Sequence, residues 1–252
     1  MPVPVVLVHG WSLAPEALAP LRSGLSRAPA LPGHAGAADW QGWDVDALAR
    51  RWLKMVVSES KAAGTPAPAI WIGASLGAQV ALAAAMLAPE RVRGLVLLGA
   101  TPCFVARDDW PQGMPQQQFE AFRLGCHQAP ARTLARFDAL QLHGDQAAST
   151  GRQALRAMRA GAPGPTREGL EAGLQVLAET DLRSRLETVQ CPTLWLTGAG
   201  DAITPPASAE AAALRQRSAR VCSVPGAGHA AYLTQPRTVT TLLRQWYQDH
   251  FS

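Results

Sequence analysis

The chain has 252 residues, of which 48% are hydrophobic and 17% charged, so it can bury the core of one ordinary α/β domain. This composition excludes the disordered and fibrous classes. The net charge of +4 is too small to indicate nucleic-acid binding, and the apolar runs end well short of the roughly 18 to 20 residues that a membrane span needs.

Strand and helix signals alternate along most of the chain, as is typical of a mostly parallel sheet with helices on both faces. Apolar β-branched runs predict strands at 3–8, 69–72, 92–98, 193–197 and 220–224, and a weak strand just before residues 31–34. Helical patterns predict helices at 45–59, 76–88, 206–216 and 238–250.

The alternation fails from about Arg107 to Asp181, where the sequence is rich in Gln and Arg, helical in pattern and broken by Gly and Pro at 161–165. A segment of this length is too long for a loop in a compact domain. We therefore predict a helical cap at 107–181, inserted into a core made of 1–106 and 182–252.

A possible nucleophile lies in the pentapeptide Gly73-Ala74-Ser75-Leu76-Gly77. This pattern fits the strand-to-helix turn that holds a serine above the sheet, with glycines relieving the crowding. An ordinary turn with a capping serine is the alternative. The pentapeptide alone does not separate the two.

Two further polar residues follow predicted strands, and the carboxyl ends of parallel strands are where such sheets bind ligands. The chain order Ser75, Asp201, His229 is the order of a hydrolase triad of nucleophile, acid and base. Backbone N–H groups of Leu76, at a helix start, and of Trp11, after the first strand, are candidates for an oxyanion hole. His9 is expected to bond loop backbone.

These motifs resemble the α/β-hydrolase superfamily along essentially the whole chain. Three segments, TPCFVARDDWPQG (101–113), RTLARFDALQ (132–141) and GLEAGLQVLAETDLR (169–183), are similar to the methyl ester esterases that act on pimeloyl-acyl carrier protein in biotin synthesis. The resemblance implies a serine esterase that needs no metal or organic cofactor. It also implies a substrate channel lined by cap residues Phe137, Asp138, Ala139, Leu140 and Gln141.

Charge is concentrated in the predicted cap. Residues 122–167 hold seven arginines against two acids, and Arg132/Arg136 and Arg152/Arg156 are each one helical turn apart. In the family that this chain resembles, such arginines contact an acidic acyl carrier protein. A basic face on the cap would raise the rate at which the carrier protein encounters the enzyme. A solvated helix face is the alternative reading.

The remaining expectations concern partners and compartment. We expect a cytoplasmic protein, because no basic and hydrophobic leader opens the chain. We also expect a monomer that binds neither nucleic acid nor membrane. Widely separated cysteines without a C-x-x-C pair indicate reduced thiols rather than a zinc site or disulfides: Cys103, Cys126, Cys191 and Cys222.

The sequence differs from the family pattern at three points. The chain begins almost at the first His-Gly strand, Ala74 stands where a large aromatic is expected, and Asp138 occupies an otherwise apolar cap position. The latter two would alter the pocket. A general carboxylesterase for short acyl esters and a non-catalytic binding module therefore stay open as alternatives.

Overall fold

In the computed structural model, which describes residues 3–39, 42–62 and 68–251, the strands form one parallel sheet in the order β2-β1-β3-β4-β5-β6. Their bounds are β1 Val5–Val8, β2 Ser26–Arg27, β3 Ala69–Ala74, β4 Val92–Leu98, β5 Thr193–Gly198 and β6 Ala219–Val224. β2 confirms the weak strand expected before residue 31. The predicted mostly parallel α/β sheet is therefore correct.

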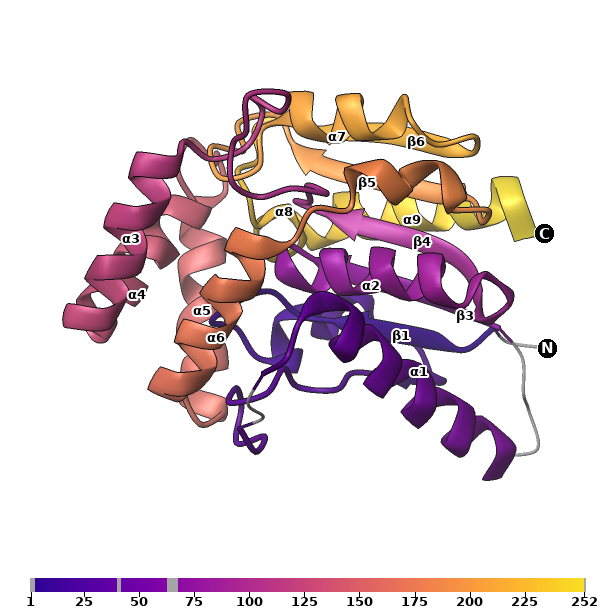
Figure 1. The fold of residues 1–252 in the computed structure, drawn as a ribbon, viewed down its shortest axis with the longest axis horizontal. Coiled ribbons are helices and arrows are strands. Elements are labelled where there is room, and N and C mark those ends of the chain that lie inside the picture. The colour runs from indigo at the N-terminus through magenta and orange to yellow at the C-terminus, as the bar shows by residue number, and fades with distance from the viewer. Residues whose placement is uncertain (1–2, 40–41, 63–67, 252) are drawn as a thin grey trace.

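Both faces of the sheet are buried, because neighbouring strand residues alternate between two hydrophobic cores. Trp71 and Leu97 belong to the core under α1 (Val45–Ala62), α2 (Leu76–Leu87) and α7 (Pro206–Ala213). Ile72 and Val96 belong to the core on the other face, with η1 (Pro15–Leu21), α8 (Ala231–Thr234) and α9 (Pro236–Phe251). The helices thus cover the sheet from both sides (Figure 1).

Strand register brings the carboxyl ends together at one edge. Val8 pairs with Gly73, Ala74 pairs with Leu98, and Gly198 pairs with Val224. The residues that follow β1, β3, β4, β5 and β6 are therefore neighbours in space, although they are far apart in the sequence.

Four helices lie beyond this edge, where the sequence predicts the cap (Figure 1). They are α3 (Gln116–Gln128), α4 (Pro130–Gln141), α5 (Ala148–Gly161) and α6 (Arg167–Glu179). Two further 3-10 helices, η2 (Pro89–Arg91) and η3 (Arg183–Thr188), lie outside the predicted cap at 107–181.

The chain leaves and re-enters the core at one place. Leu182 N–H donates to the Pro102 carbonyl over 3.0 Å. Next to it, the backbones of Cys103 and Asp181 form an isolated antiparallel β-bridge. This arrangement fits an insertion whose ends are joined. Residues 107 and 181 remain our predicted limits.

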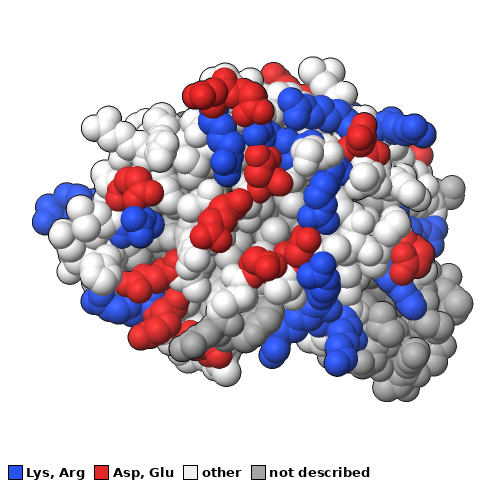
Figure 2. Space-filling view, viewed as in Figure 1, with Lys and Arg blue, Asp and Glu red and all other residues white. Residues whose placement is uncertain are grey.

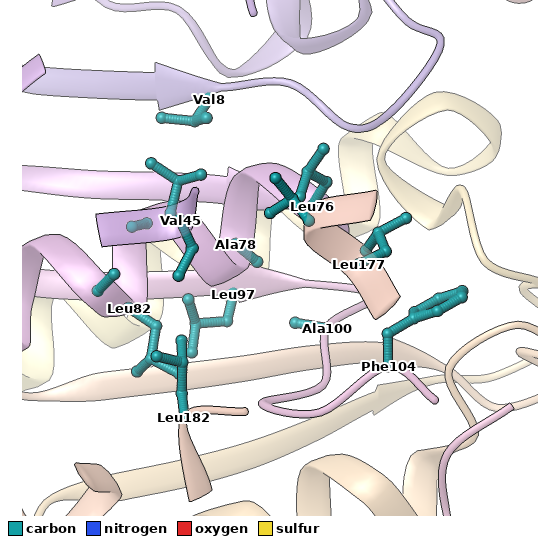
Figure 3. Close-up of a cluster of buried hydrophobic side chains, with 14 of the residues drawn as sticks. Val8, Val45, Leu76, Ala78, Leu82, Leu97, Ala100, Phe104, Leu177 and Leu182 are labelled. Carbon is teal, nitrogen blue, oxygen red and sulfur yellow. The ribbon is translucent and has the colours of Figure 1, made fainter. Parts of the chain in front are cut away.

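The helices of the predicted cap share a hydrophobic core with the sheet. Leu177 of α6 and Phe104 extend the cluster around Leu76 and Leu97 (Figure 3). Burial of this apolar surface fixes α6 against the strand ends.

Candidate active site

Ser75 is held in a strained turn between β3 and α2. Its φ of 52° and ψ of −117° lie in a region that non-glycine residues rarely adopt. A Cβ at Gly73 would approach Gly77 O to 2.3 Å, and one at Gly77 would approach Val8 O to 2.2 Å, so both positions require glycine. The Ser75 side chain makes no capping hydrogen bond. The geometry therefore favours the nucleophile turn over an ordinary capping serine.

The predicted acid and base form a buried pair. His229 Nδ1 donates to Asp201 Oδ2 over 2.8 Å, and both side chains are almost fully buried. Burial opposes ionisation of Asp201, but attraction to His229 and hydrogen bonds from His229 and Thr204 outweigh it, so the pKa of Asp201 is lowered. The neutral imidazole with its proton on Nδ1 leaves Nε2 able to accept one.

A third side chain, which the sequence reasoning missed, holds the acid in place. Thr204 donates from its hydroxyl to Asp201 Oδ2 over 2.8 Å, and the N–H groups of Ile203 and Thr204 both reach Oδ1 over 2.9 Å. Both oxygens of the Asp201 carboxylate thus accept hydrogen bonds, and these prevent the group from rotating freely. The available signal was a hydroxyl residue three positions after an acid at a strand end.

Two glycines bring the nucleophile and the base to the same edge. Ser75 N–H donates to the Leu98 carbonyl, at the end of β4, over 2.9 Å. The next residue, Gly99, packs under the imidazole, since a Cβ there would lie 3.0 Å from His229 Cε1. On the other side of Ser75, a Cβ at Gly10 would lie 3.4 Å from Ser75 Cβ.

The loop that carries Trp11 is fixed by two buried histidines. His9 Nε2 accepts from Leu31 N–H over 2.9 Å, and His34 Nε2 accepts from Ser12 N–H over 3.1 Å. Desolvation, followed by the charge of the neighbouring His34, lowers the pKa of His9 to about 3. His9 therefore bonds loop backbone as expected.

α2 begins at Leu76, and the first N–H groups of a helix have no acceptor within the helix. Ala78 and Gln79 donate theirs to the Ser75 carbonyl, over 2.9 and 3.3 Å. Trp11 itself is anchored to the cap, because its indole N–H donates to the Leu170 carbonyl over 2.9 Å. The two residues proposed for the oxyanion hole thus flank Ser75 from α2 and from the loop after β1.

An apolar cavity opens above Ser75. Trp11 and Phe137 form its wall, with ring centroids 5.1 Å apart at 84°. The lining residues are Trp11, Ser75, Phe104, Met114, Gln118, Phe122, Phe137, Leu140, Leu174, Leu177 and Ile203. These walls are mostly apolar, and Gln118 supplies an amide side chain to them.

Only part of the predicted cap stretch lines this cavity. Phe137 and Leu140, three residues apart on α4, face it, whereas Asp138, Ala139 and Gln141 do not. Helical periodicity of 100° per residue turns Asp138 and Ala139 away. Asp138 pairs with Arg159 of α5, and Ala139 is exposed. Gln141 is buried at the end of α4, where its carbonyl accepts from Ala230 N–H, just after His229, over 3.3 Å.

Ala74 also lies away from the cavity. It is fully buried in the core on the η1 and α9 face of the sheet. Its small size therefore alters the packing of that core rather than the width of the pocket.

Comparison with known proteins agrees with this geometry. A profile described as "Alpha/beta hydrolase family" matches residues 5–241. The chain belongs to the α/β-hydrolase family.

Among curated relatives, this α/β hydrolase is 39% identical to a pimeloyl-[acyl-carrier protein] methyl ester esterase of Aromatoleum aromaticum, over 95% of this chain and 96% of that one. It is 36% identical to the protein of the same name in Xylella fastidiosa, over 96% and 94%. The family resemblance found in the cap segments is thereby confirmed.

Solved structures with the same fold include esterases. One from Exiguobacterium antarcticum superposes with a TM-score of 0.84 at 21% identity, covering 98% of this chain and 92% of that one. A thermophilic esterase from Thermogutta terrifontis gives 0.78 at 25% identity, over 100% and 92%.

The cap of this hydrolase carries a set of arginines without acidic partners. Within the described residues, no ion pair involves the four exposed arginines predicted to meet a carrier, namely Arg132 and Arg136 of α4 and Arg152 and Arg156 of α5. The other three of the segment are paired: Arg123 with Glu120, Arg159 with Asp138 and Arg167 with Glu171.

On the face drawn in Figure 2, acidic and basic side chains are interspersed and acidic ones run across its middle. Of the seven arginines in residues 122–167, the four without an acidic partner lie on α4 and α5.

Other features of the chain bear on its chemistry. All four cysteines are free thiols. In residues 3–39, 42–62 and 68–251 no group of three His, Cys, Asp or Glu side chains could hold a metal ion. Nor does a helix of that described part have the length and apolarity to cross a membrane.

Proposed function

We propose that the chain is a serine carboxylesterase that hydrolyses the methyl ester of pimeloyl-[acyl-carrier protein] to pimeloyl-[acyl-carrier protein] and methanol. The buried His229–Asp201 pair, at the same sheet edge as the strained Ser75, carries this proposal. The names of the relatives supply the substrate.

Ser75 Oγ is the nucleophile in the first half of the reaction. His229 Nε2 takes its proton as Oγ attacks the ester carbonyl, and Asp201 stabilises the imidazolium that results. The N–H groups of Leu76 and Trp11 stabilise the oxyanion, an effect worth about 3 to 4 kcal/mol for each donor. Collapse breaks the bond to methoxide, which leaves as methanol with the proton from His229.

Water completes the second half. His229 removes a proton from a water molecule, and the hydroxide attacks the acyl carbon bound to Ser75 Oγ. As the intermediate collapses, the His229 imidazolium returns that proton to Ser75 Oγ, and the carboxylic acid that is released ionises in solvent. Each step uses the same three side chains, so no cofactor is required.

The cavity and the charged surface suit the two ends of this substrate. A methylene chain gains free energy by leaving water for the walls formed by Trp11, Phe137 and Leu177. The carrier protein is acidic, and the unpaired arginines of α4 and α5 would attract it. The partner proposed is therefore an acyl carrier protein that bears the ester.

The test compares three esters: carrier-linked pimeloyl methyl ester, free dimethyl pimelate and a short p-nitrophenyl ester. We expect kcat/KM to favour the carrier-linked ester and to fall with salt. The double change Arg132→Glu and Arg136→Glu should lower that kcat/KM by about tenfold and spare the free esters. Arg123→Glu, at an arginine already paired with Glu120, is the matched control.

Three results would replace the proposal. Equal use of all three esters, insensitive to salt and to charge reversal, would leave a general carboxylesterase. Full hydrolysis by Ser75→Ala would remove Ser75 from the mechanism, and absence of phosphonylation of the wild type by a fluorophosphonate would favour the non-catalytic binding module.

A further inference from the structure

The turn between α4 and α5 contains a buried carboxylate that the mechanism above does not use. Asp145 is 8% exposed and accepts three hydrogen bonds. Its Oδ1 accepts from Ala147 N–H over 2.7 Å, within the turn itself. Its Oδ2 accepts from Gly228 N–H over 2.9 Å and from the Thr234 hydroxyl over 2.7 Å.

Gly228 directly precedes the proposed base, His229, and Thr234 ends the short helix that follows it. Asp145 thus binds the chain on both sides of the histidine. An ionised carboxylate is an acceptor only, so it matches these three donors. An alanine here would leave the Gly228 N–H and the Thr234 hydroxyl without this acceptor.

Backbone contacts reinforce the same attachment. Gln146 N–H donates to Gly226 O over 2.8 Å, and Ala230 N–H donates to Gln141 O over 3.3 Å. A Cβ at Gly228 would lie 3.0 Å from Gln141 O and from His143 O, so the two segments are in close contact. Residues 226–230 are therefore positioned by the segment 141–146, which the sequence assigns to the cap.

His229 is in consequence held by two carboxylates from different parts of the molecule. Asp201, after β5, fixes the imidazole at Nδ1. Asp145, from the α4–α5 turn, fixes the peptide that carries the imidazole. A general base must lie within about 2.6–3.2 Å of the heavy atom whose proton it removes, and a misplacement of about 1 Å can cost 100-fold in rate.

We propose that Asp145 is a positioning residue for His229, through which the α4–α5 turn sets the place of the base. The proposal rests on the proposed function only in requiring that His229 activate Ser75. It does not depend on which ester is hydrolysed.

The experiment measures the second-order rate at which a fluorophosphonate labels Ser75, because this reaction needs the base but no substrate recognition. Asp145→Ala should slow labelling at least tenfold, lower kcat for a p-nitrophenyl ester by a similar factor, and leave KM within twofold. Asp145→Asn, which keeps one oxygen acceptor, should fall between Asp145→Ala and the wild type.

Thr234→Val is the matched control. It removes a buried hydrogen bond to the same Oδ2 but leaves the Gly228 N–H bonded. Labelling within twofold of the wild-type rate is expected, even where thermal unfolding shows that stability has dropped.

Two outcomes overturn the proposal: Asp145→Ala labelled at the wild-type rate, or Thr234→Val slowed as much as Asp145→Ala. If Asp145→Ala does not fold, Asp145→Asn provides the same comparison against Thr234→Val. An unlabelled wild-type protein would instead refute the proposed function itself, so the two failures are distinguishable.

Discussion

Lowering the pH from 7 to 5 should destabilise the protein through the buried histidine pair that holds the Trp11 loop. His9 and His34 each use a neutral Nε2 to accept a backbone N–H, so protonation of either ring removes an acceptor and places a charge in the core. Burial lowers the pKa of both, that of His9 from 6.5 to about 3.

The sign of the effect follows from proton binding. Between pH 3 and 6.5 the unfolded chain holds a proton on His9 and the folded chain does not, so the free energy of unfolding falls as the pH falls. A pH of 5 lies about 1.5 units below the pKa of 6.5 that His9 has in the unfolded chain. At 1.36 kcal/mol per unit, the free energy of unfolding is therefore about 2 kcal/mol lower than at pH 7. His34 adds a loss in the same direction.

Urea unfolding followed by tryptophan fluorescence at pH 7, 6 and 5 measures this loss. Asp181 and Asp201 do not interfere, because their lowered pKa values cost stability only as the pH falls below their ordinary value of 3.8. His9→Gln retains a side-chain oxygen for Leu31 N–H and cannot titrate, so its pH slope should be shallower. A wild-type stability that is equal at pH 7 and 5, or the same slope in His9→Gln, would refute the reasoning.

Three substitutions test other contacts of the site. Gly173→Ala places a methyl 2.6 Å from Trp11 Cδ1; we expect a loss of about 1 to 3 kcal/mol in urea unfolding and a lower kcat, and an unchanged kcat would contradict the role of the Trp11 loop. Thr204→Val removes a hydrogen bond to ionised Asp201, worth about 1.5 to 3 kcal/mol, and should lower kcat more than it raises KM in steady-state assays. Phe137→Ala removes a cavity wall, so KM for a long acyl ester should rise while that for a short p-nitrophenyl ester changes little; equal changes would argue against a chain-binding cavity.

The sheet and the edge at which the site lies could be predicted from the sequence because both depend on local patterns. Runs such as 92–98 alternate between two cores, and polar residues at strand ends stand out against them. This pattern singles out Ser75, Asp201 and His229 as the candidate triad. The structure then added the strained φ of Ser75, which separates the nucleophile turn from an ordinary capping serine.

Cap contacts were predicted less well, because they depend on how the helices are rotated against the core. The stretch 137–141 reads as one lining segment, yet only Phe137 and Leu140 face the cavity. Asp145 lies in a turn with no motif around it, and its partners Gly228 and Thr234 are more than 80 residues away. Such contacts become visible only when the chain is folded.

The cap has a consequence for protein engineering, since it is fastened to both loops beside the nucleophile. Asp145 bonds the loop before His229, and Arg159, paired with Asp138, donates to the Ser12 carbonyl over 3.3 Å. A chimera that exchanges this cap for that of a relative would change the acyl-binding walls and the support of both loops together. Transplanted specificity would therefore require that these two attachments be rebuilt in the recipient.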